Sequence, residues 1–345
     1  MADVDRLVRA SRLYYELGQT QERIAELLGV TRPQVSRLLK RARAEGIVEI
    51  RVIDRTTVES VDADRLQERY GLHAIHLAPR LGGPEDLTRR MVGRVAAYVM
   101  REVLRDGLTV GVGEGAAIGA TLDAMTDDGG SAVRITTVAL NGGGWSVAGQ
   151  PAAPIRLASI VGGFCQELPA PGIVATPELR RALLEHVGLQ AVVAMWNRLD
   201  VAIFGIGSYL RADNWLGADT VRELEERGAV GEVIVAPFDI DGRFVSERLR
   251  ERTIGFDARE LPRVPTTIAV ATGTGKVAPI LGALRAGVMK VLVTDEATAA
   301  AVLALDDETG AHQAKRELRA VGPGRPEAVA DEIGAEPRGR SEEGE

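Results

Sequence analysis

Five basic side chains and no acidic one lie between Thr31 and Ala44. Arginine and glutamine fit the donor and acceptor patterns of guanine and adenine in the major groove, and lysine and arginine also neutralise backbone phosphates. Such a run makes the segment a candidate for contacts with double-stranded DNA, although a basic run is often only a solvated helix face and charge alone does not decide between the two. We expect Arg37 and Ser36 to face base edges ahead of Arg43, and the later cations to contact phosphates. The candidate residues are Arg32, Gln34, Ser36, Arg37, Lys40, Arg41 and Arg43.

Four glycine-rich turns further along the chain could bind a small polar or anionic molecule. They lie at residues 111–115, 141–144, 205–208 and 273–276. Backbone N–H groups at such turns and at helix starts can hold a phosphate. The last turn ends in Lys276, one of only four lysines beside 38 arginines. This scarcity favours a chemical role for Lys276, and the alternative is a surface charge at a helix start. Carboxylates that could pair with sugar hydroxyls are Glu232, Asp239 and Asp241, although Asp241 precedes a glycine and could simply form a turn.

The cations near residue 37 require a helix-turn-helix to position them. Apolar spacing predicts helices over residues 3–17, after Thr20 and after Thr31, where Gln34 can complete a capping box. Ala25, Gly29 and Val35 are spaced four and six residues apart, as the helix-turn-helix template requires, and Gly29 can adopt the positive φ of the tight turn. The alternating residues 47–53 predict a strand of a small wing.

The glycine turns require a sheet whose strands end together. From about residue 56 to 306, apolar strand segments alternate with helical ones, which indicates a large, doubly wound, mainly parallel α/β domain. Such a sheet binds its ligand at the carboxyl ends of its strands. We expect strands at residues 109–112, 135–140, 201–204, 233–235, 267–270 and 291–293, and helices at 61–70, 87–104, 177–187 and 277–286.

The distribution of charge also divides the 345 residues into a basic N-terminal part and an acidic remainder. Residues 1–55 hold eleven basic and eight acidic side chains, a balance of +3, while the whole chain carries −7. We therefore expect a DNA-binding domain at 1–55, an effector and oligomerisation domain at 56–322, and a polar tail at 323–345. The single cysteine, Cys165, excludes an intramolecular disulfide and a cysteine-rich zinc cluster. No apolar run reaches the roughly 18 residues that span a bilayer, and the N-terminus lacks an apolar signal core, so we expect a cytoplasmic protein.

Several motifs in this order resemble the SorC-type family of sugar-binding transcriptional regulators. They lie at residues 13–51, 200–208, 228–232, 238–242, 271–286 and 291–299. The resemblance implies an effector domain similar to sugar-phosphate isomerases and deaminases that acts as a sensor, and a homodimer or homotetramer. It implies that the effector contacts are Gly113, Gly115, Ala117, Asn141, Gln150, Gly207, Ser208, Glu232 and Lys276.

The first turn departs from the family pattern. The family usually has Thr or Ser near position 117, where this chain has Ala117, and Asn141 stands where relatives often have Arg or Lys. Glu114 in the same turn would also repel a phosphate. Two readings follow: Lys276 and backbone amides hold a phosphate, or the effector is an unphosphorylated sugar or polyol.

Two enzyme classes compete with a regulator. A sugar-phosphate isomerase or deaminase would need a general base in a glycine turn, yet none of the four histidines lies in one, and Glu232 has no matching acid. A nicotinamide-binding enzyme or sensor would use Gly111 and Gly113, but the glycine spacing is loose and no acidic residue clearly follows a second strand. We therefore predict a DNA-binding regulator controlled by a sugar or sugar phosphate, without catalytic activity, cofactor or metal, and without a membrane partner.

Overall fold

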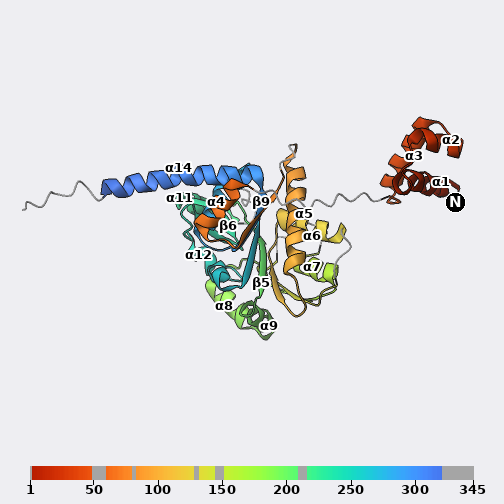
Figure 1. Ribbon diagram of the computed structural model, residues 1–345. Helices are drawn as coiled ribbons and strands as arrows, with labels where there is room; N and C mark the ends of the chain where they lie inside the picture. The colour runs from red at the N-terminus through yellow and green to blue at the C-terminus, as the bar shows by residue number, and fades with distance from the viewer. Residues whose placement is uncertain are drawn as a thin grey trace, which may run out of the picture. The chain divides into compact units, whose positions relative to one another are not determined.

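A computed structural model describes residues 2–48, 60–79, 83–127, 132–143, 151–208 and 216–320. The chain divides into two compact units, Met1–Thr56 and Thr57–Glu345 (Figure 1). Most of the wing strand expected at 47–53, and the tail expected at 323–345, lie outside the described residues.

The first unit has the three helices that apolar spacing predicts. Helix α1 (Ala2–Ser11) continues into a π-helical turn, η1 (Arg12–Glu16), and is followed by α2 (Gln21–Leu28) and α3 (Arg32–Ala44). Gly29 ends α2 with a φ of 63°, and the Thr31 N–H donates to Gln34 Oε1 at 2.8 Å in the expected capping box. The buried side chains between the helices are Ala10, Ile24, Ala25, Val35 and Leu39.

The second unit contains a seven-stranded sheet in which every neighbouring pair of strands is parallel. The strand order is β1-β9-β8-β5-β2-β3-β4. The strands are β1 (Ala74–Ala78), β2 (Thr109–Val112), β3 (Thr136–Ala139), β4 (Phe164–Gln166), β5 (Val201–Gly205), β8 (Thr266–Val270) and β9 (Val291–Asp295). The prediction of a mainly parallel α/β domain is confirmed.

Helices cover both faces of this sheet, as a doubly wound fold requires (Figure 1). Side chains of β5 alternate between two cores: Val201 and Ile203 pack with α5–α7, and Ala202 and Phe204 pack on the opposite face with α4, α9, α13 and α14. The long helices are α4 (Val61–Tyr70), α5 (Glu85–Val103), α6 (Ala116–Asp127), α7 (Ala153–Val161), α8 (Pro177–Glu185), α9 (Val187–Trp196), α11 (Ala218–Glu226), α13 (Val277–Arg285) and α14 (Glu296–Ala320). Shorter ones are α12 (Glu247–Arg250), η3 (Ala258–Arg263) and η4 (Thr274–Lys276).

The strand expected at residues 233–235 is wrong. Strands β6 (Ala229–Val233) and β7 (Ala236–Asp239) form a separate antiparallel hairpin, and Ile234 and Val235 are its turn. Both residues adopt the left-handed region, at φ 50° and 62°, which β-branched side chains disfavour. Their strand propensity is overridden because both side chains are buried and the Val235 N–H donates to the Glu232 carboxylate at 2.8 Å.

The helix expected over residues 177–187 is also two helices. Helix α8 ends at Glu185 and α9 begins at Val187. His186 separates them in an extended conformation, and its Nδ1 accepts the N–H of Gly188 at 3.1 Å.

Candidate DNA-binding and effector sites

Helix α3 presents its polar side chains on the face opposite its buried seam. Val35, Leu39 and Ala42 are buried against the other helices. At about 100° per residue, Arg37 lies opposite this seam, with Lys40 nearby and Ser36 and Arg43 on the flank. All seven candidate residues of the helix are exposed. The helix therefore has one apolar face that holds it in the unit and one polar face free for a ligand.

The exposed polar residues of α3 differ in their existing partners. Arg32 pairs with Glu22 at 2.9 Å, and Arg41 pairs with Glu45 at 2.5 Å. Gln34 uses its carbonyl oxygen in the capping box, so it would have to leave the box to read a base through that atom. Within the described residues, Arg37, Lys40 and Arg43 form no ion pair. These three are the cations best placed to meet an incoming phosphate or base edge.

The strand order brings the four glycine turns to one edge of the sheet. Strands β8, β5, β2 and β3 are consecutive neighbours and parallel, so their carboxyl ends lie side by side. Gly113 and Gly115 follow β2, Asn141 follows β3, Gly207 and Ser208 follow β5, and Lys276 follows β8 in η4. Gln150 lies outside the described residues. We call these turns together the carboxyl edge.

Glu232 reaches the carboxyl edge from the β6–β7 hairpin. Its backbone pairs with Gly207: the Gly207 N–H donates to Glu232 O at 2.8 Å, and the Glu232 N–H donates to Gly207 O at 3.2 Å. A Cβ atom at Gly207 would lie 1.7 Å from Glu232 Oε1, so a larger residue here would displace the Glu232 side chain. The lack of a side chain at Gly207 thus leaves room for the Glu232 carboxylate beside the turn after β5.

Burial and the neighbouring polar groups act on the pKa of the Glu232 carboxylate in opposite directions. Burial raises its pKa, whereas the Val235 N–H and the positive charge of Lys276 act in the opposite direction. The sequence indicated both residues as candidates, and the fold places them within electrostatic reach of each other. A carboxylate acceptor and an ammonium donor at one edge suit a polyhydroxylated or anionic ligand.

A buried polar network holds the turn that carries Lys276. Asp295, at the end of β9, accepts hydrogen bonds from the hydroxyls of Thr272 and Thr298 and is 4% exposed. The Gly273 N–H donates to Thr298 Oγ1 at 3.0 Å, and Gly273 has a φ of 105°. This network fixes the backbone immediately before η4. No sequence signal pointed to Asp295, although its place at the end of a strand could have done so.

Three residues at the turns after β2 and β3 contact other parts of the protein. Glu114 Oε1 accepts the N–H of Ala153 at 2.9 Å, at the start of α7; burial raises the pKa of Glu114, and Ala153 and Arg156 act in the opposite direction. Ala117 packs against the core beneath α6. Asn141 is 8% exposed, and its backbone bridges Gly255. Glu114 therefore has a structural partner, and Asn141 has little surface left for a ligand.

No described histidine belongs to one of the glycine turns of the carboxyl edge. His76 lies in β1 at the border of the sheet, where burial lowers its pKa, and His186 caps α9. Among the described residues no group of three or more His, Cys, Asp or Glu side chains could hold a metal ion. Nor does any described helix combine the length and apolar character that a membrane span needs.

A helix-turn-helix with an exposed basic face, joined in one chain to a parallel α/β domain with a polar carboxyl edge, defines a ligand-sensing DNA-binding protein. Comparison with known families agrees: a sugar-binding domain model matches residues 57–304, and a Crp-like helix-turn-helix model matches residues 5–69. The chain belongs to the SorC-type family of sugar-binding transcriptional regulators.

Individual relatives match along nearly their whole length. The sorbitol operon regulator of Klebsiella pneumoniae is 28% identical over 313 residues, which cover 87% of this chain and 98% of the relative. The deoxyribonucleoside regulator of Bacillus subtilis is 31% identical over 311 residues, covering 86% and 96%. The crystal structure of full-length SorC from Klebsiella pneumoniae has a TM-score of 0.65 at 25% identity, covering 88% of this chain and all of that one. None of these comparisons supports the enzyme alternatives.

Proposed function

We propose that the recognition helix α3 binds operator DNA and that a sugar or sugar phosphate at the carboxyl edge controls this binding. In this proposal residues 1–55 form the DNA-binding domain and 56–322 the effector and oligomerisation domain. The observation that carries it is the convergence of the turns after β8, β5, β2 and β3 with Glu232 at one edge, in a chain that also has a helix-turn-helix.

The DNA contacts divide into two kinds. Arg37 and Ser36 contact base edges, because they lie on the outward faces near the start of α3, the part that enters the major groove in this motif. Lys40, Arg41 and Arg43 contact phosphates from the second half of the helix. Arg32 also contributes once it leaves its exposed pair with Glu22, which costs little because exposed pairs are weak.

The effector contacts combine charge with backbone donors. Lys276 pairs with an anionic or hydroxyl group, Glu232 accepts a sugar hydroxyl, and the turns at Gly113, Gly115, Gly207 and Ser208 offer backbone N–H groups. The attachment of Glu114 to Ala153 supports binding of either a sugar or its phosphate, because this carboxylate already has a hydrogen-bond donor. Asn141 and Ala117 shape the edge from behind, and Gln150 belongs to the same proposed site.

The protein acts by binding, without catalysis, as a cytoplasmic homodimer or homotetramer. The curated relatives named above are regulators, which supports the first statement. Dimerisation suits a helix-turn-helix because two modules bind two half-sites one helical turn apart.

A thermal-shift screen of sugars, polyols and their phosphates tests the effector assignment, since a ligand that binds only the native state raises its apparent stability. Each hit is then added to the full chain bound to a duplex selected from a random pool. We expect one matched pair of sugar and sugar phosphate to shift the melting temperature and change DNA affinity in wild type but not in Lys276→Ala. An unchanged response in that variant would remove Lys276 from the site. Turnover of a hit at substrate concentrations would instead restore the enzyme reading.

A further inference from the structure

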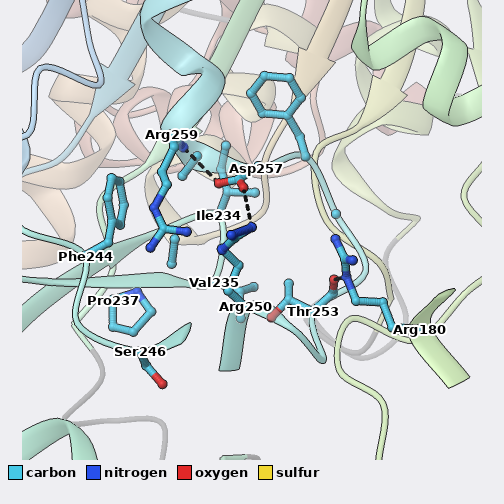
Figure 2. A pocket seen from close by; sticks show the side chains of 14 residues that line it. Arg180, Ile234, Val235, Pro237, Phe244, Ser246, Arg250, Thr253, Asp257 and Arg259 are labelled. Atoms are coloured by element: carbon cyan, nitrogen blue, oxygen red, sulfur yellow. Dashed lines mark hydrogen bonds and ion pairs between the residues drawn. The ribbon is translucent and has the colours of Figure 1, made fainter. Parts of the chain in front are cut away.

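A cavity lies between the β6–β7 hairpin and residues 253–259 (Figure 2). Its walls are mostly apolar and include the turn residues Ile234 and Val235 together with Phe244 and Phe256. Three arginines, Arg180, Arg250 and Arg259, also line it, with Asp257 as the one lining carboxylate. An apolar wall with a few converging charged groups is the usual composition of a ligand pocket.

The three arginines differ in how many of their N–H groups have ion-pair or hydrogen-bond partners. Arg250 Nε pairs with Glu247 at 2.8 Å, and its Nη1 pairs with Asp257 at 3.3 Å, so both ends of its guanidinium have carboxylate partners. Figure 2 shows this arginine between the other two, with its guanidinium directed at Asp257.

Arg180 lacks such a partner within the described part of the chain. Its Nε donates to the carbonyl oxygen of Thr253 at 2.6 Å, and it forms no ion pair. Burial lowers the pKa of Arg180, the charge of Arg250 lowers it further, and Asp257 partly offsets this effect. A half-buried guanidinium that faces a second cation is unfavourable without an anion, because burial of an unpaired charge carries a desolvation cost.

Arg259 supplies a second unsatisfied donor in the same cavity. Its Nη2 pairs with Glu247, and its guanidinium lies 5.2 Å from the centre of the Phe244 ring. Its Nη1 is fully buried and has no hydrogen-bond partner. Buried donors of this kind are rare, and each one calls for an acceptor.

We propose that this cavity binds the carboxylate or phosphate group of a small metabolite through the arginines that line it. The free space is about 30 Å³. That volume exceeds the roughly 10–15 Å³ needed for one water, so the cavity has room for a small group such as an oxyanion. Guanidinium groups bind both kinds of oxyanion through paired N–H donors. The site is additional to the sugar site proposed above.

The cavity shares its walls with elements of the carboxyl edge. Val235 lines the cavity, while its N–H donates to Glu232. Gly255 lines it too and bridges Asn141, which follows β3. An anion bound here therefore contacts the turn that holds Glu232, and it modulates the affinity of the carboxyl edge for its own ligand.

Isothermal titration calorimetry of the full chain with sodium benzoate and with inorganic phosphate, at constant ionic strength set with sodium chloride, tests the proposal. We expect saturable binding of at least one probe, and a Kd at least tenfold higher in Arg180→Gln. Arg181→Gln is the matched control, because Arg181 is the exposed neighbour on α8 and does not line the cavity. Arg259→Gln tests the opposite wall and serves if Arg180→Gln does not fold.

The two probes distinguish a carboxylate from a phosphate ligand. Lys276→Ala should keep the binding event that Arg180→Gln weakens, because Lys276 belongs to the other site. Loss of probe binding in Lys276→Ala, or equal Kd values in wild type and both cavity variants, would overturn the proposal. So would the absence of any saturable binding by either probe.

Discussion

At the scale of single residues, Arg37 carries the sharpest prediction of the DNA interface. It lies opposite the buried seam of α3 and forms no ion pair within the described residues. We expect Arg37→Ala to reduce preference for the selected duplex over a scrambled one by about 5- to 150-fold, since one good bidentate base contact contributes about 1–3 kcal/mol of discrimination. Fluorescence anisotropy with both duplexes measures this ratio.

The comparison variant for Arg37 is Arg43→Ala. A phosphate contact carries no sequence information, so this change should weaken binding to both duplexes alike and reduce the slope of log affinity against log salt by about 0.9. Equal losses on both duplexes in Arg37→Ala would show that it too contacts only phosphate. Effector affinity should stay unchanged in both variants.

The raised pKa of Glu232 leads to a prediction of how the stability of the protein depends on pH. Burial raises its pKa above the ordinary value of 4.5, so the native state holds this proton more tightly than the unfolded chain. The resulting stabilisation is complete below the unfolded-state pKa and is lost as pH rises through the folded-state pKa. We expect Glu232→Gln, which mimics the protonated form, to gain stability relative to wild type across this window, by about 1.4 kcal/mol for each unit of pKa elevation.

Urea unfolding at a series of pH values measures this difference. Glu225→Gln is the control, because Glu225 is exposed on α11. A constant difference between wild type and Glu232→Gln from pH 4 to pH 8 would contradict the assignment of a raised pKa.

At the scale of elements, Asp306 connects three helices of the effector domain. Asp306 on α14 accepts hydrogen bonds from Arg285 of α13 at 2.7 Å, and from Arg69 and Tyr70 of α4 at 2.5 and 2.8 Å. Asp306 is 5% exposed, and burial alone would raise its pKa; the hydrogen bonds from these three side chains nevertheless lower it below the ordinary value. The carboxylate therefore stabilises the packing of α4, α13 and α14 in its ionised form.

We expect Asp306→Asn to lower the free energy of unfolding by about 1.5–3 kcal/mol at neutral pH, because Arg285 would lose its 2.7 Å carboxylate partner and keep only the more distant Asp241, at 3.7 Å. Since the folded-state pKa is depressed, this contribution is present above the unfolded-state pKa and is lost as pH falls through the folded-state value. The matched control is Asp307→Asn, whose carboxylate is exposed and should contribute much less, because exposed ion pairs are weak. Equal effects of the two variants in urea unfolding would refute the role of burial.

Elements differ in how well the sequence predicts them. Helix α4 agrees with its prediction residue for residue, because a period of 3.6 and a terminal Gly71 are both local signals. The prediction of a strand at residues 233–235 was wrong because strand propensity is a local property. The burial and the Glu232 carboxylate that stabilise the turn come from tertiary structure. Strand β4 was not predicted: it has three residues, and the side chain of Phe164 is 63% exposed.

The candidate sites likewise combine features that the sequence predicts with features that depend on tertiary contacts. The faces of α3 follow from its apolar spacing, so the exposed cations could be predicted from the sequence. The grouping of the glycine turns follows once the strands are taken as parallel, because their carboxyl ends then coincide. The sequence could not predict the hydrogen bond from Ala153 of α7 to Glu114, or the cavity between the β6–β7 hairpin and residues 253–259. Each joins segments whose contact depends on the folded sheet.

At the scale of the whole molecule, we propose that α13 and Asp306 couple the carboxyl edge to α4, from which the chain continues back to the DNA-binding unit. Helix α13 begins directly after Lys276 and ends at Arg285, which bonds to Asp306. Asp306 in turn bonds to α4, the first described helix after residues 49–59. A ligand that shifts α13 can thus alter the position of α4, from which the chain leads back to the helix-turn-helix.

The last prediction concerns the size of this coupling. An effector changes DNA affinity only if it binds the DNA-competent and DNA-incompetent states with different affinity, and linkage then requires DNA to change effector affinity by the same factor. Couplings of this kind are typically about 5- to 150-fold. We expect the factor from DNA titrations with and without effector to equal the factor from effector titrations with and without DNA.

Asp306→Asn should reduce both factors together while leaving effector affinity for the free protein within a few-fold of wild type, because Asp306 lies away from the carboxyl edge. Asp307→Asn should leave both factors unchanged. An effector that binds free and DNA-bound protein equally well would contradict regulation through this domain. A normal coupling factor in a folded Asp306→Asn protein would place the path elsewhere, because the connection from α13 through Asp306 to α4 would then be dispensable.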